Sequence, residues 1–138
     1  MKAYLDTSAF VKRYIQENGS EQVNDILMQT SELALSIICL PELLSALTRS
    51  KKEKRLSSSQ YQKIKSAIYE DIADIMMYPI TAQVIAVAIQ VIEQHGIKAL
   101  DALHIASAYE WACDYFVSAD DTQAMAAKKM QLKVMLIK

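Results

Sequence analysis

The first ten residues constrain the fold more than any other stretch of the chain. The segment Lys2–Leu5 favours a short buried strand that begins directly after Met1. Polarity then changes abruptly at Asp6, and either Thr7 or Ser8 can cap a following helix. The apolar stripe of that helix is Phe10, Val11, Tyr14 and Ile15. We therefore expect a carboxylate at the point where a strand passes into a helix.

Asp6 by itself has two interpretations. It can simply help to cap the helix, which is a common use of aspartate. It can also belong to a binding site, because ligands of open α/β sheets collect at the carboxyl ends of the strands. Further carboxylates at the same edge would favour the second interpretation.

The rest of the chain alternates between strand and helix patterns. Strands are expected at Lys2–Leu5, Leu33–Ile37, Met77–Ile80, Tyr115–Ser118 and Val134–Ile137, and Pro79 favours a sheet edge for the third of them. Beyond the first helix, further helices are expected at Ser20–Met28, Pro41–Arg55, Ser57–Ile75, Thr81–His95, Ala99–Ala112 and Thr122–Met130. This alternation predicts an α/β fold, with a parallel sheet covered by helices on both faces.

Length and composition predict a single domain, residues 1–138. Apolar residues make up 52% of the chain, yet no apolar run approaches the roughly 20 residues that span a bilayer. The early first strand leaves no room for a signal peptide, so we expect a cytoplasmic protein with no membrane partner. Cys39 and Cys113 stand alone and are expected to be reduced thiols.

Four acidic residues stand out by their positions. Asp6 and Asp120 end the first and fourth strands, whereas Glu42 and Asp101 lie in the first turns of two helices. Strand ends and the starts of the following helices share one edge of such a sheet, so all four can converge. Asp101 is the strongest single case, because its neighbours are almost all apolar and a lone carboxylate there would be costly.

Carboxylates that converge must either take up protons or bind a cation. Two like charges about 4 Å apart repel by roughly 4 kcal/mol at an effective dielectric of 20. Ligation by oxygen alone suits Mg²⁺ or Mn²⁺. Such an ion can polarise a phosphoryl oxygen and activate a bound water, which is the chemistry of phosphodiester hydrolysis.

The order of these acids carries a family resemblance. The segments Tyr4–Ala9, Pro41–Leu43, Leu100–Ala106 and Val117–Asp120 resemble the four acidic motifs of PIN-domain ribonucleases, especially the VapC toxins of toxin–antitoxin pairs. The resemblance covers essentially the whole chain. It implies a three-layer α/β/α sandwich with a five-stranded parallel sheet ordered 3-2-1-4-5. It also implies an Mg²⁺- or Mn²⁺-dependent endonuclease that cleaves RNA, forms a homodimer and is inhibited by a small antitoxin.

The resemblance also assigns roles to individual residues. The acids Asp6, Glu42, Asp101 and Asp120 match the metal-binding residues of the family, and Ser118 matches its polar residue before the last acid. The chain has Gln131 where the family often has glycine before the last strand.

Other polar residues near these acids are expected to support them. Thr7, Ser8 and His104 are expected beside the acids, with His104 a satisfied, partly buried histidine rather than a ligand. Asp121 is expected to be a helix cap or to lie just behind Asp120.

Two charged groups outside the acidic motifs have competing interpretations. The cations Lys12, Arg13, Lys51 and Lys52 can contact RNA phosphates, although the second pair also suits a solvated helix end. Glu70, Asp71 and Asp74 form a rival acidic group, which is expected to be a solvated helix face.

Two other functions remain open from the residues alone. One is a PIN-like module that binds RNA or protein with little turnover. The other is a phosphatase that uses Asp6 as the phosphoryl acceptor, although such enzymes usually carry a second aspartate where this chain has Ser8.

Overall fold

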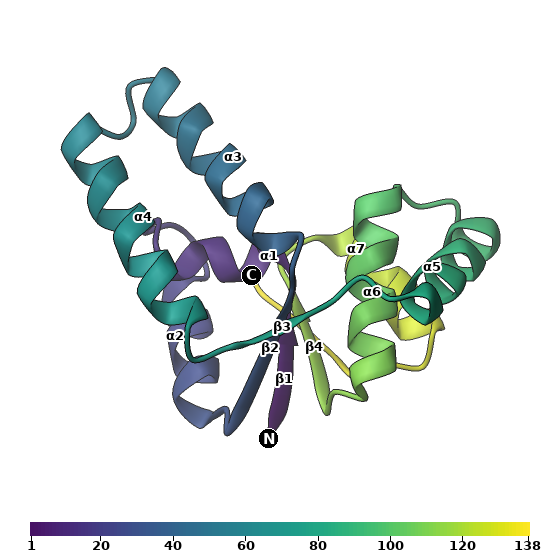
Figure 1. Ribbon diagram of the computed structural model, residues 1–138. Helices are drawn as coiled ribbons and strands as arrows, with labels where there is room; N and C mark the ends of the chain where they lie inside the picture. The colour runs from purple at the N-terminus through teal and green to yellow at the C-terminus, as the bar shows by residue number, and fades with distance from the viewer.

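The computed structural model describes residues 1–138 as a five-stranded parallel sheet covered by helices (Figure 1). The strands lie in the order β3-β2-β1-β4-β5, and every neighbouring pair is parallel. Their bounds are β1 (Lys2–Leu5), β2 (Glu32–Ser36), β3 (Met76–Tyr78), β4 (Tyr115–Ser118) and β5 (Val134–Leu136). The predicted strand order is therefore confirmed. β3 lies at an edge, as Pro79 indicated, although the strand ends at Tyr78, just before this proline.

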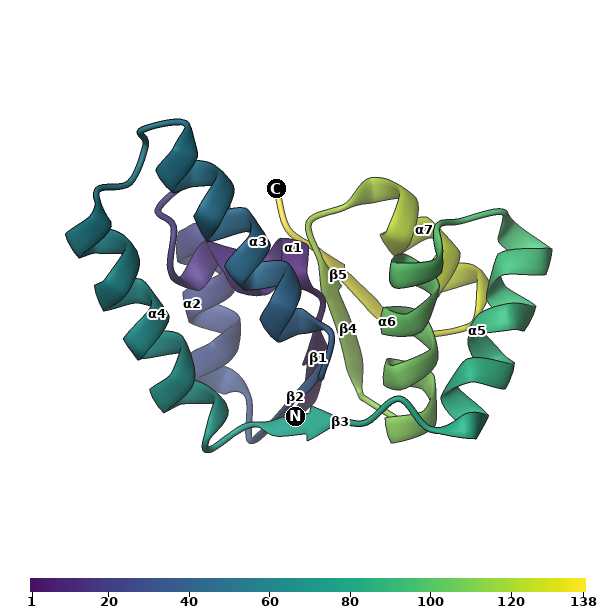
Figure 2. The ribbon, with the colours of Figure 1, turned by 45° about the horizontal axis from the view of Figure 1, so that its top comes forward.

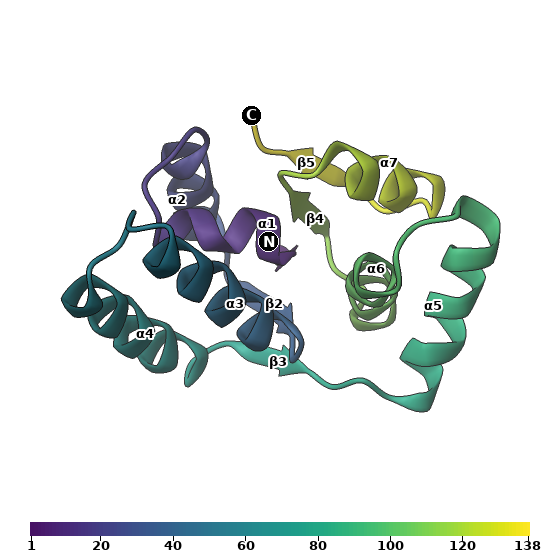
Figure 3. The same ribbon diagram turned by 90° about the horizontal axis from the view of Figure 1, so that it is seen from above.

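The helices divide between the two faces of the sheet, as the view from above shows (Figure 3). One face carries α1 (Thr7–Phe10) with a 3₁₀ turn (Val11–Arg13), α2 (Ser20–Gln29), α3 (Cys39–Lys52) and α4 (Ser58–Ile72). The other carries α5 (Ala82–His95), α6 (Ala99–Trp111) and α7 (Asp121–Lys129). The result is the predicted three-layer α/β/α sandwich.

The alternation of side chains along β1 connects the sheet to two separate cores. Ala3 and Leu5 belong to the core under α1–α4, whereas Tyr4 belongs to the core under α5–α7. All three side chains are fully buried. Because both faces of a parallel sheet are covered, its central strands are apolar on both sides, and polar groups concentrate where the strands end.

Several predicted helix boundaries are confirmed by their caps. Ser57 and Gln60 form a reciprocal capping box at the start of α4, and the Thr81 hydroxyl accepts the Val84 N–H at the start of α5. Gly96 ends α5 in the left-handed conformation, with φ of 64°.

Other boundaries differ from the sequence prediction by a few residues: α3 is Cys39–Lys52 rather than Pro41–Arg55, and α4 ends at Ile72 rather than Ile75. The starts of α1 and α2 and the end of α1 differ for reasons that the hydrogen bonds show. Asp6, rather than Thr7 or Ser8, caps α1, because its carboxylate accepts the Ala9 N–H. The first helix is short and passes into a 3₁₀ turn, a common way to satisfy the carbonyl groups of a last helical turn. At the start of α2 the capping position is Gly19, since the Ser20 side chain is occupied by Glu17 N–H and Ile15 C=O.

None of the helices is both long enough and apolar enough to cross a lipid bilayer. Cys39 is buried, Cys113 is half-buried, and both are free thiols, as the sequence predicted.

Gln131 adopts the left-handed backbone conformation directly before β5, with φ of 66°. A side chain at such a position costs about 1 kcal/mol, because Cβ crowds the carbonyl oxygen. We expect Gln131→Gly to raise the free energy of unfolding by up to about 1 kcal/mol, measured by urea denaturation. Gln131→Ala keeps the Cβ atom and should bring no such gain; an equal gain from alanine would show that backbone strain is not the cause.

Candidate active site

The carboxyl ends of β1 and β4 lie side by side at the centre of the sheet. The starts of α1, α3, α6 and α7 gather above them at the same edge (Figures 1 and 2). Asp6 and Asp120 are the residues that cap α1 and α7, while Glu42 and Asp101 lie in the first turns of α3 and α6. The topology thus brings all four predicted acids to the carboxyl ends of the strands.

Asp6 is the most buried of the four acids, with no exposed area. Its Oδ1 accepts the Ser8 hydroxyl at 2.6 Å and the Ala9 N–H at 3.0 Å. Its Oδ2 is buried and has no hydrogen-bond partner. Burial raises the pKa of Asp6 above its ordinary value, although the nearby hydroxyls of Ser118 and Ser8 act in the opposite direction. Asp6 is therefore a fully buried carboxylate, and one of its two oxygens has no hydrogen-bond partner.

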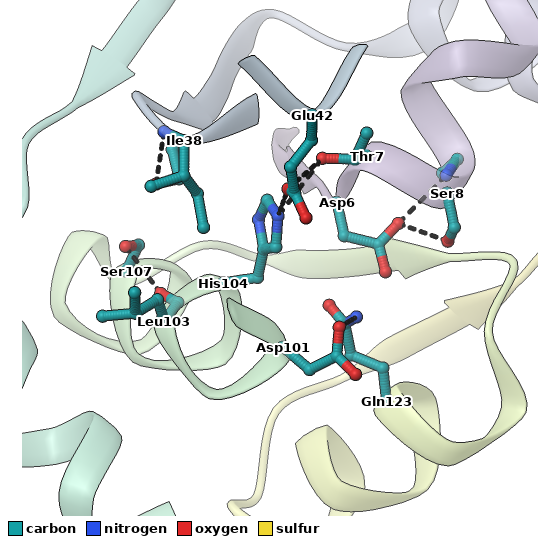
Figure 4. A network of polar contacts seen from close by, with 12 residues as sticks. Asp6, Thr7, Ser8, Ile38, Glu42, Asp101, Leu103, His104, Ser107 and Gln123 are labelled. Atoms are coloured by element: carbon teal, nitrogen blue, oxygen red, sulfur yellow. Dashed lines mark hydrogen bonds and ion pairs between the residues drawn. The ribbon is translucent and has the colours of Figure 1, made fainter. Parts of the chain in front are cut away.

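Glu42 lies at the end of a row of hydrogen-bonded side chains that runs from Tyr4 through His104. Its Oε1 accepts the Thr7 hydroxyl at 2.6 Å and lies 2.6 Å from His104 Nε2 (Figure 4). His104 Nδ1 lies 2.7 Å from the Tyr4 hydroxyl. A carboxylate only accepts hydrogen bonds, so Nε2–H donates to Glu42, while Nδ1 shares a hydrogen bond with the Tyr4 hydroxyl.

This row keeps Glu42 ionised and fixes its direction. Burial would raise the pKa of Glu42, but the hydrogen bonds from His104 and Thr7 outweigh it and lower the pKa below its ordinary value. His104 itself is only 1% exposed. His104 is thus hydrogen-bonded through both ring nitrogens, consistent with the prediction of a satisfied histidine, but it is fully rather than partly buried. One Glu42 oxygen remains outside the row.

Asp101 and Asp120 are joined through Gln123. The side-chain amide of Gln123 donates to Asp101 Oδ1 at 3.0 Å, and its backbone N–H donates to Asp120 Oδ1 at 3.0 Å. Burial and then the charge of Asp120 raise the pKa of Asp101. The repulsion between converging carboxylates that the sequence predicted is therefore present between these two residues.

Ser8 and Ser118 connect the two central acids. The Ser8 hydroxyl donates to Asp6 and accepts the Ala119 N–H at 2.9 Å, while Ser118 Oγ accepts the Asp120 N–H at 3.0 Å. The two serine oxygens lie 3.4 Å apart. Hydrogen bonds thus run from Asp6 through both serines to Asp120, and from there through Gln123 to Asp101.

The chemistry of these donors fits a hard divalent cation. All the candidate ligands are oxygens, and Asp6 Oδ2 is a buried acceptor with no partner of its own. In Figure 4 the Asp6 carboxylate points toward the side chains of Asp101 and Gln123. As the side chains stand, however, no group of three His, Cys, Asp or Glu residues is gathered closely enough to hold a metal ion.

The remaining predicted site residues lie away from these acids or are engaged elsewhere. Asp121 does not cap α7, because Asp120 occupies that position; its side chain is 81% exposed and lies 3.5 Å from Lys138 Nζ. Lys51 and Lys52 are exposed near the end of α3, where the Lys51 ammonium lies 5.1 Å from the centre of the Tyr61 ring.

Lys12 and Arg13 are both held by neighbouring groups. Lys12 bonds the Asn18 carbonyl at 2.6 Å and pairs with Glu17, whereas Arg13 pairs with Asp71 at 2.9 Å. The prediction of a purely solvated acidic face on α4 is therefore wrong for Asp71, because Arg13 and the Tyr14 hydroxyl both bind its carboxylate. Contact between either cation and RNA remains a prediction.

Sequence reasoning missed two residues of this region, Tyr4 and Gln123. The strand alternation could have identified Tyr4, because it places that side chain on the face opposite Leu5, toward the helix of His104. A weaker signal marks Gln123, which follows the capping Asp120 by three residues on a helix face otherwise made of alanines.

Comparisons with known proteins agree with this architecture. The family model of the PIN domain matches residues 3–129. FitAcB from Neisseria gonorrhoeae superimposes with a TM-score of 0.72 and 20% identity over 96% of both chains. A search of curated proteins finds no match to the sequence.

Two further solved structures share the fold. VapBC2 from Rickettsia felis, bound to a DNA fragment from its promoter, has a TM-score of 0.70 and 19% identity over 100% of both chains. VapC20 from Mycobacterium tuberculosis, described as a toxin that cleaves the sarcin–ricin loop, has a TM-score of 0.69 and 15% identity over 90% of this chain and 94% of its own. The match of the family model over nearly the whole length shows that this chain belongs to the PIN domain family.

Proposed function

We propose that this chain is a metal-dependent endoribonuclease and the toxin of a toxin–antitoxin pair. The observation that carries the proposal is the meeting of four acids at the carboxyl ends of the strands, where Asp6 has a buried oxygen with no partner. Family membership supports a nuclease, and the VapC20 toxin with the same fold is described as cleaving the sarcin–ricin loop.

Asp6, Glu42, Asp101 and Asp120 would hold Mg²⁺ or Mn²⁺. When bound, the ion would supply charge to a phosphoryl oxygen and lower the pKa of a bound water. Hydrogen bonds already orient three of these carboxylates. Ser8 donates to Asp6, Thr7 and His104 donate to Glu42, and Gln123 donates to Asp101.

Asp101 would act as the general base toward the attacking water. Burial and then the charge of Asp120 raise its pKa above the ordinary aspartate value. Its Oδ1 accepts from Gln123, so Oδ2 would take the proton of an attacking water. In-line attack by water on the phosphodiester would leave a 5′-phosphate and a 3′-hydroxyl.

A PIN-like module that binds RNA or protein with little turnover is the second candidate. The observation that favours it is that no three acidic or metal-binding side chains are gathered closely enough for an ion. Turnover with added metal, abolished by Asp6→Asn, separates the two candidates.

The partners proposed are an RNA substrate, a second copy of the chain and an antitoxin protein. Toxin–antitoxin complexes among the structures with this fold support the last of these. Met76 on the edge strand β3 is 51% exposed, and adaptable methionine surfaces often serve at interfaces. Light scattering at micromolar concentration tests self-association, and a monomer would contradict it. Co-purification with the product of a small neighbouring reading frame tests the antitoxin.

Metal binding gives the sharpest test of the residues chosen. We expect calorimetric titration with Mn²⁺ to show a site whose affinity falls by more than about 10-fold in Asp101→Asn, because a charged ligand is lost. Asp121→Asn removes the same charge from the next acidic position and should bind as the unchanged protein does. Equal affinity in the unchanged protein and Asp101→Asn would show that Asp101 is not a ligand.

A further inference from the structure

Gln123 donates hydrogen bonds to the side chains of both Asp101 and Asp120. It lies in the first turn of α7 and is 3% exposed, packed where the neighbouring buried positions are alanines. Its side-chain amide and its backbone N–H each donate to one of the two carboxylates, both at 3.0 Å. A single residue thus fixes the directions of two like-charged groups.

The amide orientation of Gln123 leaves its oxygen free. A carboxylate can only accept, so the amide NH₂ must face Asp101, and Oε1 therefore points elsewhere. Oε1 is buried without a hydrogen-bond partner, as is Asp6 Oδ2. In Figure 4 the Gln123 amide and the Asp6 carboxylate point into the same space. Buried acceptors without partners are rare, so two of them facing one space indicate a place for a ligand.

The uncharged amide suits this position better than a cation would. A lysine between Asp101 and Asp120 would neutralise them and compete with any divalent ion. Gln123 instead supplies two N–H donors without adding charge, so the carboxylates stay close together and remain available. A leucine of similar size would fill the same volume but would hold neither the direction of Asp101 nor an oxygen toward Asp6.

We propose that Gln123 is a positioning residue of the site: it holds Asp101 beside Asp120 and presents its amide oxygen to the space that Asp6 faces. This inference rests on the proposed metal-dependent function. It predicts that Gln123 acts through the cation affinity of the carboxylates, in addition to any part in packing.

Two measurements on Gln123→Leu test this role. The first is the affinity for Mn²⁺ by calorimetry, which should fall about 10-fold, as is typical when a residue that orients a metal ligand is lost. The second is a double-mutant cycle with Asp101→Ala in EDTA, followed by urea unfolding, which should show that the two substitutions are not additive. Gln60→Leu, at the corresponding early position of α4, is the matched control; it should leave the Mn²⁺ affinity unchanged and be additive with Asp101→Ala.

The outcomes separate this inference from the proposed function. Additive effects in EDTA would overturn the inference whatever the metal does. Unchanged or tighter Mn²⁺ binding by Gln123→Leu, with normal binding by the unchanged protein, would also overturn it while leaving the metal site intact. No Mn²⁺ binding by the unchanged protein would contradict the proposed function, and the inference with it. Non-additive effects of the two substitutions, together with weaker Mn²⁺ binding by Gln123→Leu, would support both the inference and the proposed function.

Discussion

Asp6→Asn should reduce RNA cleavage by more than about 100-fold and at the same time stabilise the folded chain at neutral pH. The activity loss follows because the substitution removes the charge of the central carboxylate, which costs more than the loss of an orienting partner. Asparagine still caps a helix as well as aspartate does, so the start of α1 should survive. The two effects in opposite directions distinguish a site residue from a structural one.

The gain in stability should depend on pH in a defined way. Burial raises the pKa of Asp6 in the folded chain, so the folded state binds its proton more tightly than the unfolded state does. The free energy of unfolding therefore falls as pH rises from the ordinary aspartate pKa through the raised one. Asp6→Asn removes this fall, so its advantage should be present at pH 7 and vanish below about pH 4.

Urea unfolding of both proteins across this pH range provides the measurement. Asp121→Asn is the matched control, because that side chain is 81% exposed and should change neither cleavage nor the pH profile. If Asp6→Asn cleaves RNA at the normal rate, Asp6 has no part in the chemistry. If it is destabilised at pH 7, its carboxylate is a structural cap above all.

His104→Ala should lower the free energy of unfolding by about 3 kcal/mol or more, the largest effect on stability that we expect. The imidazole is 1% exposed, so its removal leaves a cavity. It also leaves the buried Tyr4 hydroxyl without its partner and removes one of the two donors to Glu42. The pKa of Glu42 should rise as a result, since hydrogen bonding by His104 is a main cause of its depression.

The other histidine of the chain is a suitable control. His95 ends α5, is half-buried, and its Nε2 atom has no hydrogen-bond partner, so truncation leaves no donor or acceptor behind. We expect His95→Ala to cost less than about 1 kcal/mol by the same urea assay. Equal losses for both histidines would show that the row from Tyr4 to Glu42 contributes little to stability.

The sequence predicted the sheet because local signals and the family resemblance agreed. The strand patterns end at Asp6 and Asp120, and two of the helices begin with the caps Ser57 and Thr81. These signals predicted the bounds of the elements to within a few residues. The order of the strands came from the resemblance. What failed was local: the sequence could not decide between Asp6 and its neighbours as the cap of α1, because all three side chains are competent acceptors.

The acids of the site could be predicted from the sequence, but two residues of the hydrogen-bond network around them could not. The four carboxylates stand out in the sequence by their positions at strand ends and helix starts, and Asp101 also by its apolar neighbours. Gln123 and Tyr4 do not, because each acts through a contact with a residue far away in the chain: 22 positions separate Gln123 from Asp101, and 100 separate Tyr4 from His104. Arg13 likewise donates to Asp71, which lies 58 positions further along the chain, and no local pattern indicated this pair.

The most direct test of the central claim is the chemistry of the cut ends. Single-stranded RNA would be incubated with the full chain in Mg²⁺ or Mn²⁺ and, in parallel, in EDTA, and the termini of the products would be analysed. Attack by water predicts 5′-phosphate and 3′-hydroxyl ends, with no cleavage in EDTA. A 2′,3′-cyclic phosphate, or full activity in EDTA, would contradict hydrolysis at a metal site formed by Asp6, Glu42, Asp101 and Asp120.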